Sequence, residues 1–551
     1  MLISALAAAS VGVSPAPASF AAACRQLEGY TSAGLVVTEA REIAEGPAPY
    51  SEFAPSNNAA GPPPRLPPHC LVRAELDRRT GTGGVAYAIK LELRIPDAWN
   101  GRFLFQGGGG MNGVLLPAIG YNIAERTAIP PALARNFAVV STDSGHEGTP
   151  LDPTFARDQE AKINYGYASI GKVTLAAKAL LQKVTGRLPE HSYFAGCSNG
   201  GREAMMAAQR FPGEFDGVLA GNPAFEMTNA LILTSFSSWV YADAAKQLKT
   251  DSAHLFTPAD TLLIQKAMLR QCDSLDGAAD GMIFNHQACR FDVRKLACRK
   301  TQKAGCLDPV KVNAIVRAFR GPLDATGAPF VGSWTSDAGN FSPDWLIWQT
   351  GAPTPAGVFT DLRDMVRSAA ASLAAFPEEK TAQTGGDADA LKLYKASRGA
   401  ASLTDATSTQ LTSFAAHGGK MMLVSGWSDP IFSAPDLIAY YERLSADMNA
   451  ATGTDPASFA RLFLIPGMAH CGGGDGLDDF DALDLLVNWV EKQDPPSVLT
   501  ARGAAFPGVE RPICAYPLIA RYKGRGPLNA SESFTCAAPT APPLAASGAA
   551  P

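Results

Sequence analysis

Short apolar runs recur along the first 221 residues and predict β-strands. Residues 87–95 alternate between apolar and polar, and Phe103-Leu104-Phe105, 137–141, 192–195 and 216–221 form further short apolar runs. Apolar residues at helical spacing from Ile170 to Leu181 predict a helix, and residues 202–211 predict another. Strands that alternate with helices are typical of a mostly parallel sheet with helices on both faces.

The alternation stops near residue 224 and resumes near residue 410. The intervening segment is rich in Ala, Thr, Ser, Asp and Pro. Strands are predicted again at 420–424 and 461–465, and the chain then shows an amphipathic helix around 483–490. We therefore expect an α/β domain formed by residues 24–223 and 410–551, with residues 224–409 inserted as a lid over its active edge.

Composition narrows the class of protein. The chain has 551 residues, of which 46% are hydrophobic, and a formal net charge of −5. This length exceeds what one compact core needs, so a main domain with a large insertion fits it well. The acidic balance, without long Lys/Arg runs, argues against nucleic acid or anionic membrane as a partner. After the N-terminal segment, no stretch has the 18 or so uninterrupted apolar residues of a membrane span.

The N-terminus and the cysteines indicate export. Residues 1–23 are small, apolar and uncharged, like the apolar region and cleavage zone of a signal peptide, although a positive N-terminal region is missing. A lipoprotein site at Cys24 is a weaker alternative, because Ala21 suits its first position poorly. The ten cysteines include no CxxC pair, so five disulfides in a secreted or periplasmic protein are expected rather than ten free thiols. The sequence alone leaves their connectivity open, although three neighbouring pairs would close short loops: Cys272 with Cys289, Cys298 with Cys306, and Cys514 with Cys536.

A GxSxG motif carries the clearest chemical signal. Gly196-Cys197-Ser198-Asn199-Gly200 lies between a predicted strand and a predicted helix. A serine at such a turn projects its hydroxyl from the sheet edge, and the glycines permit the close approach of the helix. The N-terminus of that helix also directs N–H groups towards an oxyanion. The pattern therefore predicts Ser198 as a nucleophile.

A serine nucleophile needs a base and an acid. In α/β-hydrolases they follow the serine in the order acid, then histidine, each after a strand. Among the seven histidines, His470 has this position, since it follows the predicted strand 461–465. Asp429 follows the predicted strand 420–424 and would orient the imidazole of His470. Weaker candidates for the acid lie within helical or glycine-rich segments: Asp436, Asp475 and Asp478.

Two further features adjoin these residues. Cys197 precedes the proposed nucleophile and Cys471 follows the proposed base, so a disulfide between them is geometrically plausible if the serine and the histidine meet. A glycine run, residues 107–110, follows an apolar strand, where an oxyanion-hole loop belongs, with Asn199 supplying a second backbone N–H. The run lacks the GK[ST] of a phosphate-binding loop, which argues against nucleotide binding.

An acidic loop lies within the inserted segment. Asp273, Asp276 and Asp280 alternate with glycines and offer hard oxygen ligands for Ca²⁺. The spacing is not that of an EF-hand. From the spacing alone, a calcium site and a solvated acidic turn are equally supported.

Taken together, these motifs resemble the tannase and feruloyl esterase family of α/β-hydrolases over about residues 24–536. The resemblance rests on Gly196-Cys197-Ser198-Asn199-Gly200-Gly201-Arg202-Glu203, Gly426-Trp427-Ser428-Asp429, Pro466-Gly467-Met468-Ala469-His470-Cys471 and the order of the ten cysteines. It implies a Ser198, Asp429 and His470 triad, with oxyanion donors at Gly110 and Asn199. It also implies structural calcium held by Asp273, Asp276 and Asp280 with the carbonyls of Ala278 and Met282. The implied disulfides are Cys24 with Cys70, Cys197 with Cys471, Cys272 with Cys289, Cys298 with Cys306, and Cys514 with Cys536.

The resemblance also implies a reaction. Family members hydrolyse esters of aromatic acids, so we expect a small ester of feruloyl, galloyl or terephthaloyl type as substrate and an acyl-enzyme at Ser198. Phe432 and Met227 are similar in place to pocket residues, although both could equally belong to the core. Two alternatives stay open: a hydrolase of another ester or amide class on the same fold, and a noncatalytic binding protein. The sequence leaves the oligomeric state open.

Overall fold

A computed structural model describes residues 19–49, 63–121, 123, 129–149, 152–302, 304–352 and 385–540. Most of the predicted signal peptide, residues 1–18, lies outside this set. The described chain starts with helix α1 (Phe20–Arg25), which overlaps the last residues of that peptide. Cys24 at its end is bonded to Cys70.

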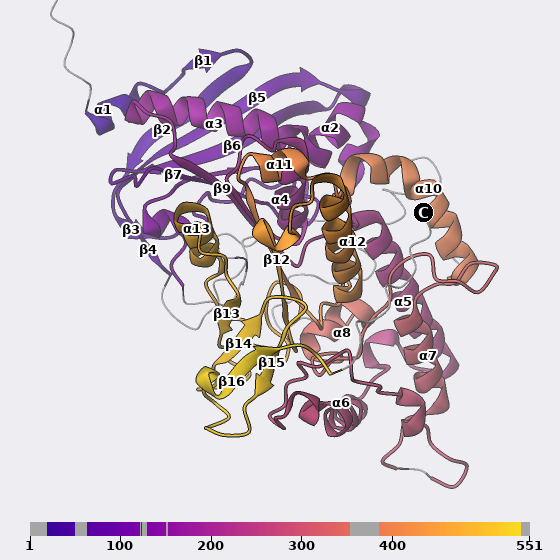
Figure 1. Cartoon of the computed structure of the whole chain (residues 1–551). Coiled ribbons are helices and arrows are strands. Elements are labelled where there is room, and N and C mark those ends of the chain that lie inside the picture. The colour runs from indigo at the N-terminus through magenta and orange to yellow at the C-terminus, as the bar shows by residue number, and fades with distance from the viewer. Residues whose placement is uncertain are drawn as a thin grey trace, which may run out of the picture.

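A ten-stranded sheet runs through the described part of the chain (Figure 1). Its strands, in spatial order, are β1 (Thr31–Ser32), β2 (Leu35–Ile43), β5 (His69–Thr80), β6 (Ala86–Pro96), β8 (Ala138–Thr142), β7 (Arg102–Gln106), β9 (His191–Cys197), β10 (Gly217–Gly221), β11 (Lys420–Gly426) and β12 (Ala460–Ile465). The strands from β8 to β12 in this order pair in parallel, whereas β1, β2, β5 and β6 are antiparallel. The predicted α/β class is therefore confirmed, with an antiparallel extension at the N-terminal edge in which β6 is the strand predicted over residues 87–95, whereas β2 and β5 were not predicted.

The parallel strands bring the candidate site residues to one edge of the sheet. Gly221 pairs in register with Cys197 on one side and with Val424 on the other. The loops that follow β9, β10, β11 and β12 therefore leave the sheet at the same carboxyl edge, where ligands bind in open α/β sheets.

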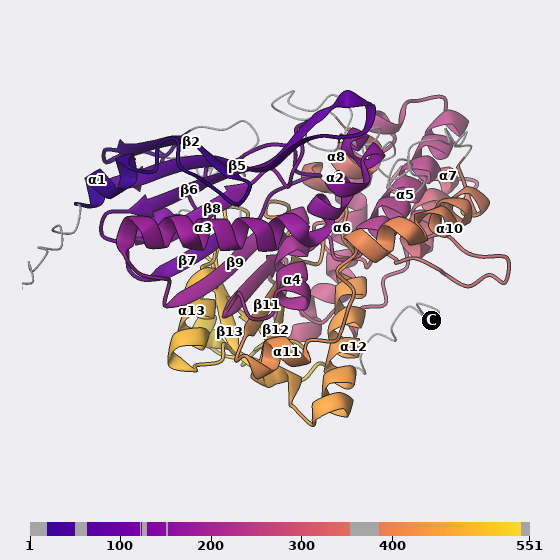
Figure 2. The same ribbon diagram turned by 90° about the horizontal axis from the view of Figure 1, so that it is seen from above.

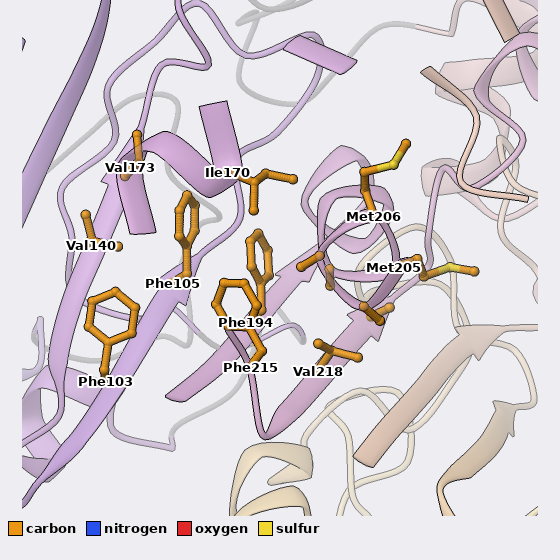
Figure 3. Close-up of a cluster of buried hydrophobic side chains, with 14 of the residues drawn as sticks. Phe103, Phe105, Val140, Ile170, Val173, Phe194, Met205, Met206, Phe215 and Val218 are labelled. Atoms are coloured by element: carbon orange, nitrogen blue, oxygen red, sulfur yellow. The ribbon is translucent and has the colours of Figure 1, made fainter. Parts of the chain in front are cut away.

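Helices cover both faces of the sheet, and alternate strand residues fill the two cores. One face packs against α3 (Ser169–Thr185), α4 (Asn199–Arg210) and α12 (Ala434–Thr452), and the other against α13 (Ala482–Lys492). Figure 3 shows the first core around Phe103, Phe105 and Phe194, whose rings at 105 and 194 stack 4.6 Å apart. Leu104 points to the opposite core, as the period of two in a strand requires.

The segment between β10 and β11 is mainly helical where it is described. It holds α5 (Met227–Gln247), α6 (Pro258–Cys272), α7 (Pro309–Arg320), α8 (Pro343–Thr350), α10 (Asp387–Thr404) and the short α11 (Thr412–Ala416). Helices α5, α6, α7, α8 and α10 lie to one side of the sheet, away from β1 and β2 (Figures 1 and 2). They enclose an apolar core of their own, with Phe236, Tyr241 and Trp345 fully buried. We refer to residues 224–409 as the insertion.

Smaller elements complete the fold. Two hairpins follow α13, β13 (Val498–Ala501) with β14 (Arg511–Cys514), and β15 (Ile519–Tyr522) with β16 (Phe534–Ala537). The pair β3 (Gly46–Pro47) and β4 (Arg65–Leu66) and the helix α2 (Gln159–Ile163) lie nearer the N-terminus. Across the described residues, no helix combines the length and the apolar character that crossing a membrane requires.

All ten cysteines are paired in disulfides. The bonds join Cys24 to Cys70, Cys197 to Cys471, Cys272 to Cys289, Cys298 to Cys306, and Cys514 to Cys536. These are the five pairs that the family resemblance implies. The alternative of ten free thiols is therefore wrong.

Candidate active site

Ser198 lies at a sharp turn between β9 and α4. Its backbone has φ 62° and ψ −125°, a strained conformation for a residue other than glycine. A Cβ on Gly196 would lie 2.7 Å from the backbone of Gly200, and one on Gly200 would lie 2.6 Å from the carbonyl oxygen of Gly108. The glycines of the motif are therefore required by close backbone approach. Helix α4 begins at Asn199, three residues earlier than the apolar spacing predicted.

The predicted acid and base meet at the carboxyl edge of the sheet. Nδ1 of His470 lies 2.9 Å from Oδ2 of Asp429. The other oxygen of Asp429 accepts hydrogen bonds from the backbone N–H groups of Ile431 and Phe432, at 2.8 and 3.0 Å. The Asp429 side chain is fully buried, whereas that of His470 keeps 13% of its surface exposed. A fixed carboxylate behind a partly open imidazole is the arrangement that a catalytic base needs.

Asn222 completes the surroundings of Asp429, and the motifs did not indicate it. Its Nδ2 donates to Oδ2 of Asp429 at 2.7 Å. Asn222 directly follows β10, the strand next to β11. Its position after a predicted strand could have indicated that it lies at the carboxyl edge of the sheet. Asp429 thus has four hydrogen-bond donors: Asn222, His470, and the backbone N–H groups of Ile431 and Phe432.

A disulfide fixes the nucleophile turn to the histidine loop. Cys197 and Cys471 are bonded with their Cα atoms 6.0 Å apart, although 274 residues separate them in the sequence. Ser198 is therefore held beside the loop of His470. Two aromatic rings flank that imidazole: Phe432 at 5.3 Å and Trp348 of α8 at 5.9 Å between ring centroids. The Trp348 contact brings the insertion to the candidate site.

The glycine loop after β7 packs against the nucleophile turn. A Cβ on Gly107 would lie 2.6 Å from Cα of Gly200, and Gly110 adopts φ 55°. The backbone N–H of Gly108 donates to Oε2 of Glu203 at 2.9 Å. The loop that carries Gly110 and the N-terminus of α4 that carries Asn199 are thus adjacent, which suits a pair of backbone oxyanion donors.

The Asn199 side chain points into the protein. Its Oδ1 accepts hydrogen bonds from Arg202 at 2.6 Å and from Tyr165 at 3.1 Å, and its Nδ2 donates to Asn112 at 2.5 Å. The side chain is completely buried. The side chain of Asn199 is therefore engaged within the protein.

An apolar cluster borders the site. Met227 and Phe432 both belong to it, together with Met111, which follows Gly110 in the glycine loop. Ala224, in the same cluster, donates its backbone N–H to the carbonyl oxygen of Ser198 at 3.0 Å. Met227 and Phe432 are 5% and 8% exposed, so both are core residues, and of the two Phe432 contacts His470.

The other candidates for the catalytic acid and base lie outside the Asp429–His470 pair. Asp436 lies in the first turn of α12, Asp475 accepts from Gln265 at 3.0 Å, and Asp478 accepts from the Gly473 N–H at 2.7 Å. The imidazole of His286 contacts Asp337 at 2.7 Å. Two other histidines near carboxylates, His254 and His417, lie nearer the surface. Among the described carboxylates, it is therefore Asp429 that lies behind His470.

The acidic loop of the insertion follows α6. Asp273 and Asp276 accept backbone hydrogen bonds from Gly281 and Phe284, and Asp280 pairs with Arg511 of β14 at 2.5 Å. Burial, aided by the neighbouring carboxylates, raises the pKa of Asp276 to about 7 and that of Asp273 above its usual value. Within the described residues, no three His, Cys, Asp or Glu side chains converge as ligands of a metal ion. In this structure, backbone amides and Arg511 contact the three carboxylates.

Comparison with known proteins assigns the chain to a family. The tannase and feruloyl esterase family matches residues 76–537. The chain belongs to this family. It is therefore a carboxylic ester hydrolase.

Individual relatives agree with the assignment. The chain is 38% identical to the mono(2-hydroxyethyl) terephthalate hydrolase of Piscinibacter sakaiensis, over 95% of this chain and 93% of that protein. It is 28% identical to a probable feruloyl esterase of Arthroderma benhamiae, over 82% of each chain. The fold is similar to that of feruloyl esterase B from Aspergillus oryzae, with a TM-score of 0.77 and 23% identity over 94% of this chain and 100% of the other.

Proposed function

We propose that this protein is a secreted or periplasmic serine esterase that cleaves esters of aromatic acids. The observation that carries the proposal is the His470–Asp429 contact at the sheet edge where Ser198 follows β9, with a disulfide that joins the neighbours of Ser198 and His470. The five disulfides support an oxidising compartment. The names of the relatives support an aromatic acyl group.

The reaction follows from the geometry. His470 would take the proton of the Ser198 hydroxyl as the oxygen attacks the ester carbonyl, while Asp429 stabilises the imidazolium. The backbone N–H groups of Gly110 and Asn199 would stabilise the oxyanion. The alcohol leaves with the proton from His470, and water then hydrolyses the acyl-enzyme by the same route. Met227, Phe432 and the neighbouring apolar cluster would contact the aromatic ring.

We propose calcium as a structural ion in the acidic loop. Asp273, Asp276 and Asp280, with the carbonyls of Ala278 and Met282, are the residues that would hold it. Three carboxylates in one short loop repel one another, and a dication would relieve that repulsion. The ion would stabilise the insertion and would not take part in the ester chemistry.

Hydrolysis of a small ester panel tests the reaction. Methyl ferulate, methyl gallate and mono(2-hydroxyethyl) terephthalate would be given to the wild type, to Ser198→Ala and to Ser235→Ala. We expect the wild type to turn over at least one ester and Ser198→Ala to lose at least about 1000-fold in kcat. Ser235→Ala is the matched control, because Ser235 is a buried serine of α5 whose hydroxyl has no hydrogen-bond partner among the described residues.

The outcomes separate the alternatives. A folded Ser198→Ala variant with wild-type turnover would refute the serine mechanism. Cleavage of a peptide anilide at a rate comparable to that of the esters would favour the amide hydrolase. Absence of turnover on a wider range of esters, with ligand binding retained, would favour a noncatalytic protein.

A further inference from the structure

Asp337, in the insertion, contacts both loops that carry the candidate base and acid. Its side chain is fully buried, and its Oδ2 accepts a hydrogen bond from the Ser428 hydroxyl at 2.5 Å and another from the Gly467 N–H at 2.7 Å. Ser428 directly precedes Asp429, and Gly467 lies three residues before His470. One carboxylate therefore bridges two loops that follow different strands.

His286 occupies the other oxygen of Asp337. Its Nε2 lies 2.7 Å from Oδ1, and its fully buried ring stacks on Trp427 with centroids 3.9 Å apart. Trp427 belongs to the same loop as Ser428 and Asp429. The imidazole of His286 thus supports the acid loop twice, through Asp337 and through the stacked ring.

Asp337 is well suited to accept hydrogen bonds as a carboxylate. Burial alone would raise its pKa, but the hydrogen bonds from His286, Ser428 and Gly467 outweigh burial and lower the pKa below the usual value. The charge therefore stays on Asp337 in the folded protein. A buried carboxylate that accepts three hydrogen bonds holds its donors firmly in place. Removing it would leave these donors without their acceptor, which is costly in a buried site.

The backbone beside Asp337 approaches the histidine loop closely. A Cβ on Gly339 would lie 2.3 Å from the carbonyl oxygen of Gly467 and 2.8 Å from Oγ of Ser428. Farther along the insertion, Asp344 accepts the N–H of Gly474 at 2.8 Å. The insertion thus packs directly on the loop of His470 at more than one point.

We propose that Asp337, held by His286, is a positioning residue that aligns Asp429 and His470 and makes ester hydrolysis depend on docking of the insertion. The inference rests on the proposed function of Ser198, His470 and Asp429. It differs from a purely structural role in one respect: loss of the Asp337 carboxylate lowers kcat, while KM changes little, because the carboxylate bonds to His286, Ser428 and Gly467 rather than to Met227 or Phe432.

Steady-state kinetics on the best ester of the panel test the proposal. For Asp337→Ala we expect kcat to fall about 10- to 100-fold with KM within about threefold of the wild type. For Ser428→Ala, which removes one of the three donors, we expect a fall of about three- to tenfold. The double variant should be no slower than Asp337→Ala, since both changes remove the same contact.

Asp260→Ala is the matched control for lost stability. Asp260 is a carboxylate of the insertion that completes the capping box of α6 and pairs with Lys311 at 2.7 Å, remote in sequence from both catalytic loops. We expect it to lower the melting temperature without lowering kcat. A folded Asp337→Ala variant with kcat within twofold of the wild type would overturn the proposal, as would an equal kcat loss in Asp260→Ala.

Two further measurements keep the test decisive. If Asp337→Ala does not fold, Ser428→Ala decides alone, and a kcat within twofold of the wild type overturns the proposal. Labelling of the wild type with a fluorophosphonate, followed by mass analysis, tests Ser198 separately. Failure to label Ser198 would refute the serine mechanism itself, whereas labelled wild type with unchanged variants would refute only the role of Asp337.

Discussion

At the scale of single residues, buried polar side chains hold together the loops of the candidate site. Glu203 is an example, because its two oxygens accept from the Gly108 N–H at 2.9 Å and from Asn112 at 2.6 Å, and Asn199 donates at 3.3 Å. Glu203 is 2% exposed. It therefore joins the glycine loop to the helix that follows Ser198, the two sources of the proposed oxyanion donors.

Replacement of Glu203 tests this connection. In Glu203→Ala the donors of Gly108 and Asn112 lose their acceptor, so the glycine loop should shift and kcat should fall by about 10- to 100-fold. We expect KM to change less than kcat, and measurement of both constants on the preferred ester checks it. Glu214→Ala, which removes a carboxylate paired with Lys178 at 2.9 Å, is the control. Wild-type kcat in Glu203→Ala would contradict the role of this carboxylate.

At the scale of elements, the parallel strands of the sheet could be predicted from the sequence, whereas the antiparallel strands could be predicted only in part. The apolar run 103–105 lies in β7, and the run 461–465 lies in β12, because buried parallel strands are continuously apolar. The antiparallel strand β5 escaped prediction, since its charged residues interrupt the apolar pattern. The contacts of Asp337 and of Glu203, although Glu203 belongs to the GxSxG motif region, were not predicted, because a buried carboxylate looks like any surface acid until its partners are known.

The two ends of the insertion are joined by a hydrogen-bonded carboxylate. Asp405, at the end of α10, accepts from the hydroxyl of Thr228 in α5 at 2.6 Å. Burial raises the pKa of Asp405 to about 6, with a further rise from Glu226, while Thr228 and Arg398 act in the opposite direction. A folded pKa above the unfolded value means that Asp405 favours folding at pH below about 4. That contribution is lost as the pH rises through about 6.

Asp405→Asn should therefore reduce the pH dependence of stability. The amide keeps an acceptor for Thr228 and carries no charge. We therefore expect the free energy of unfolding of the variant, relative to that of the wild type, to be roughly 1–3 kcal/mol higher at pH 8 than at pH 4. Denaturant unfolding at several pH values measures this difference. Asp324→Asn, at an exposed turn of the insertion, serves as the control. An unchanged pH profile in Asp405→Asn would show that Asp405 does not titrate in this range.

At the scale of the whole molecule, the acidic loop lies where the insertion meets the C-terminal hairpins. Arg511 of β14 contacts Asp280 at 2.5 Å, and Asn285 donates to Oγ1 of Thr540 at 2.8 Å. The Cys272 to Cys289 disulfide closes the segment that contains the loop. An ion bound to these carboxylates would therefore stabilise the contact between two parts of the chain that are more than 200 residues apart.

Calcium should raise the melting temperature of the protein. Binding to the folded state alone stabilises it by mass action, so calcium at about 100 times its Kd should raise Tm by roughly 2 °C relative to protein in EDTA. Asp276→Asn should lose most of this shift, because it removes one of the charged ligands. Asp260→Asn, a carboxylate change in the neighbouring helix α6, should keep the shift. Equal melting temperatures of the wild type with calcium and with EDTA would contradict the site, whatever the esterase activity, because the readout is stability rather than turnover.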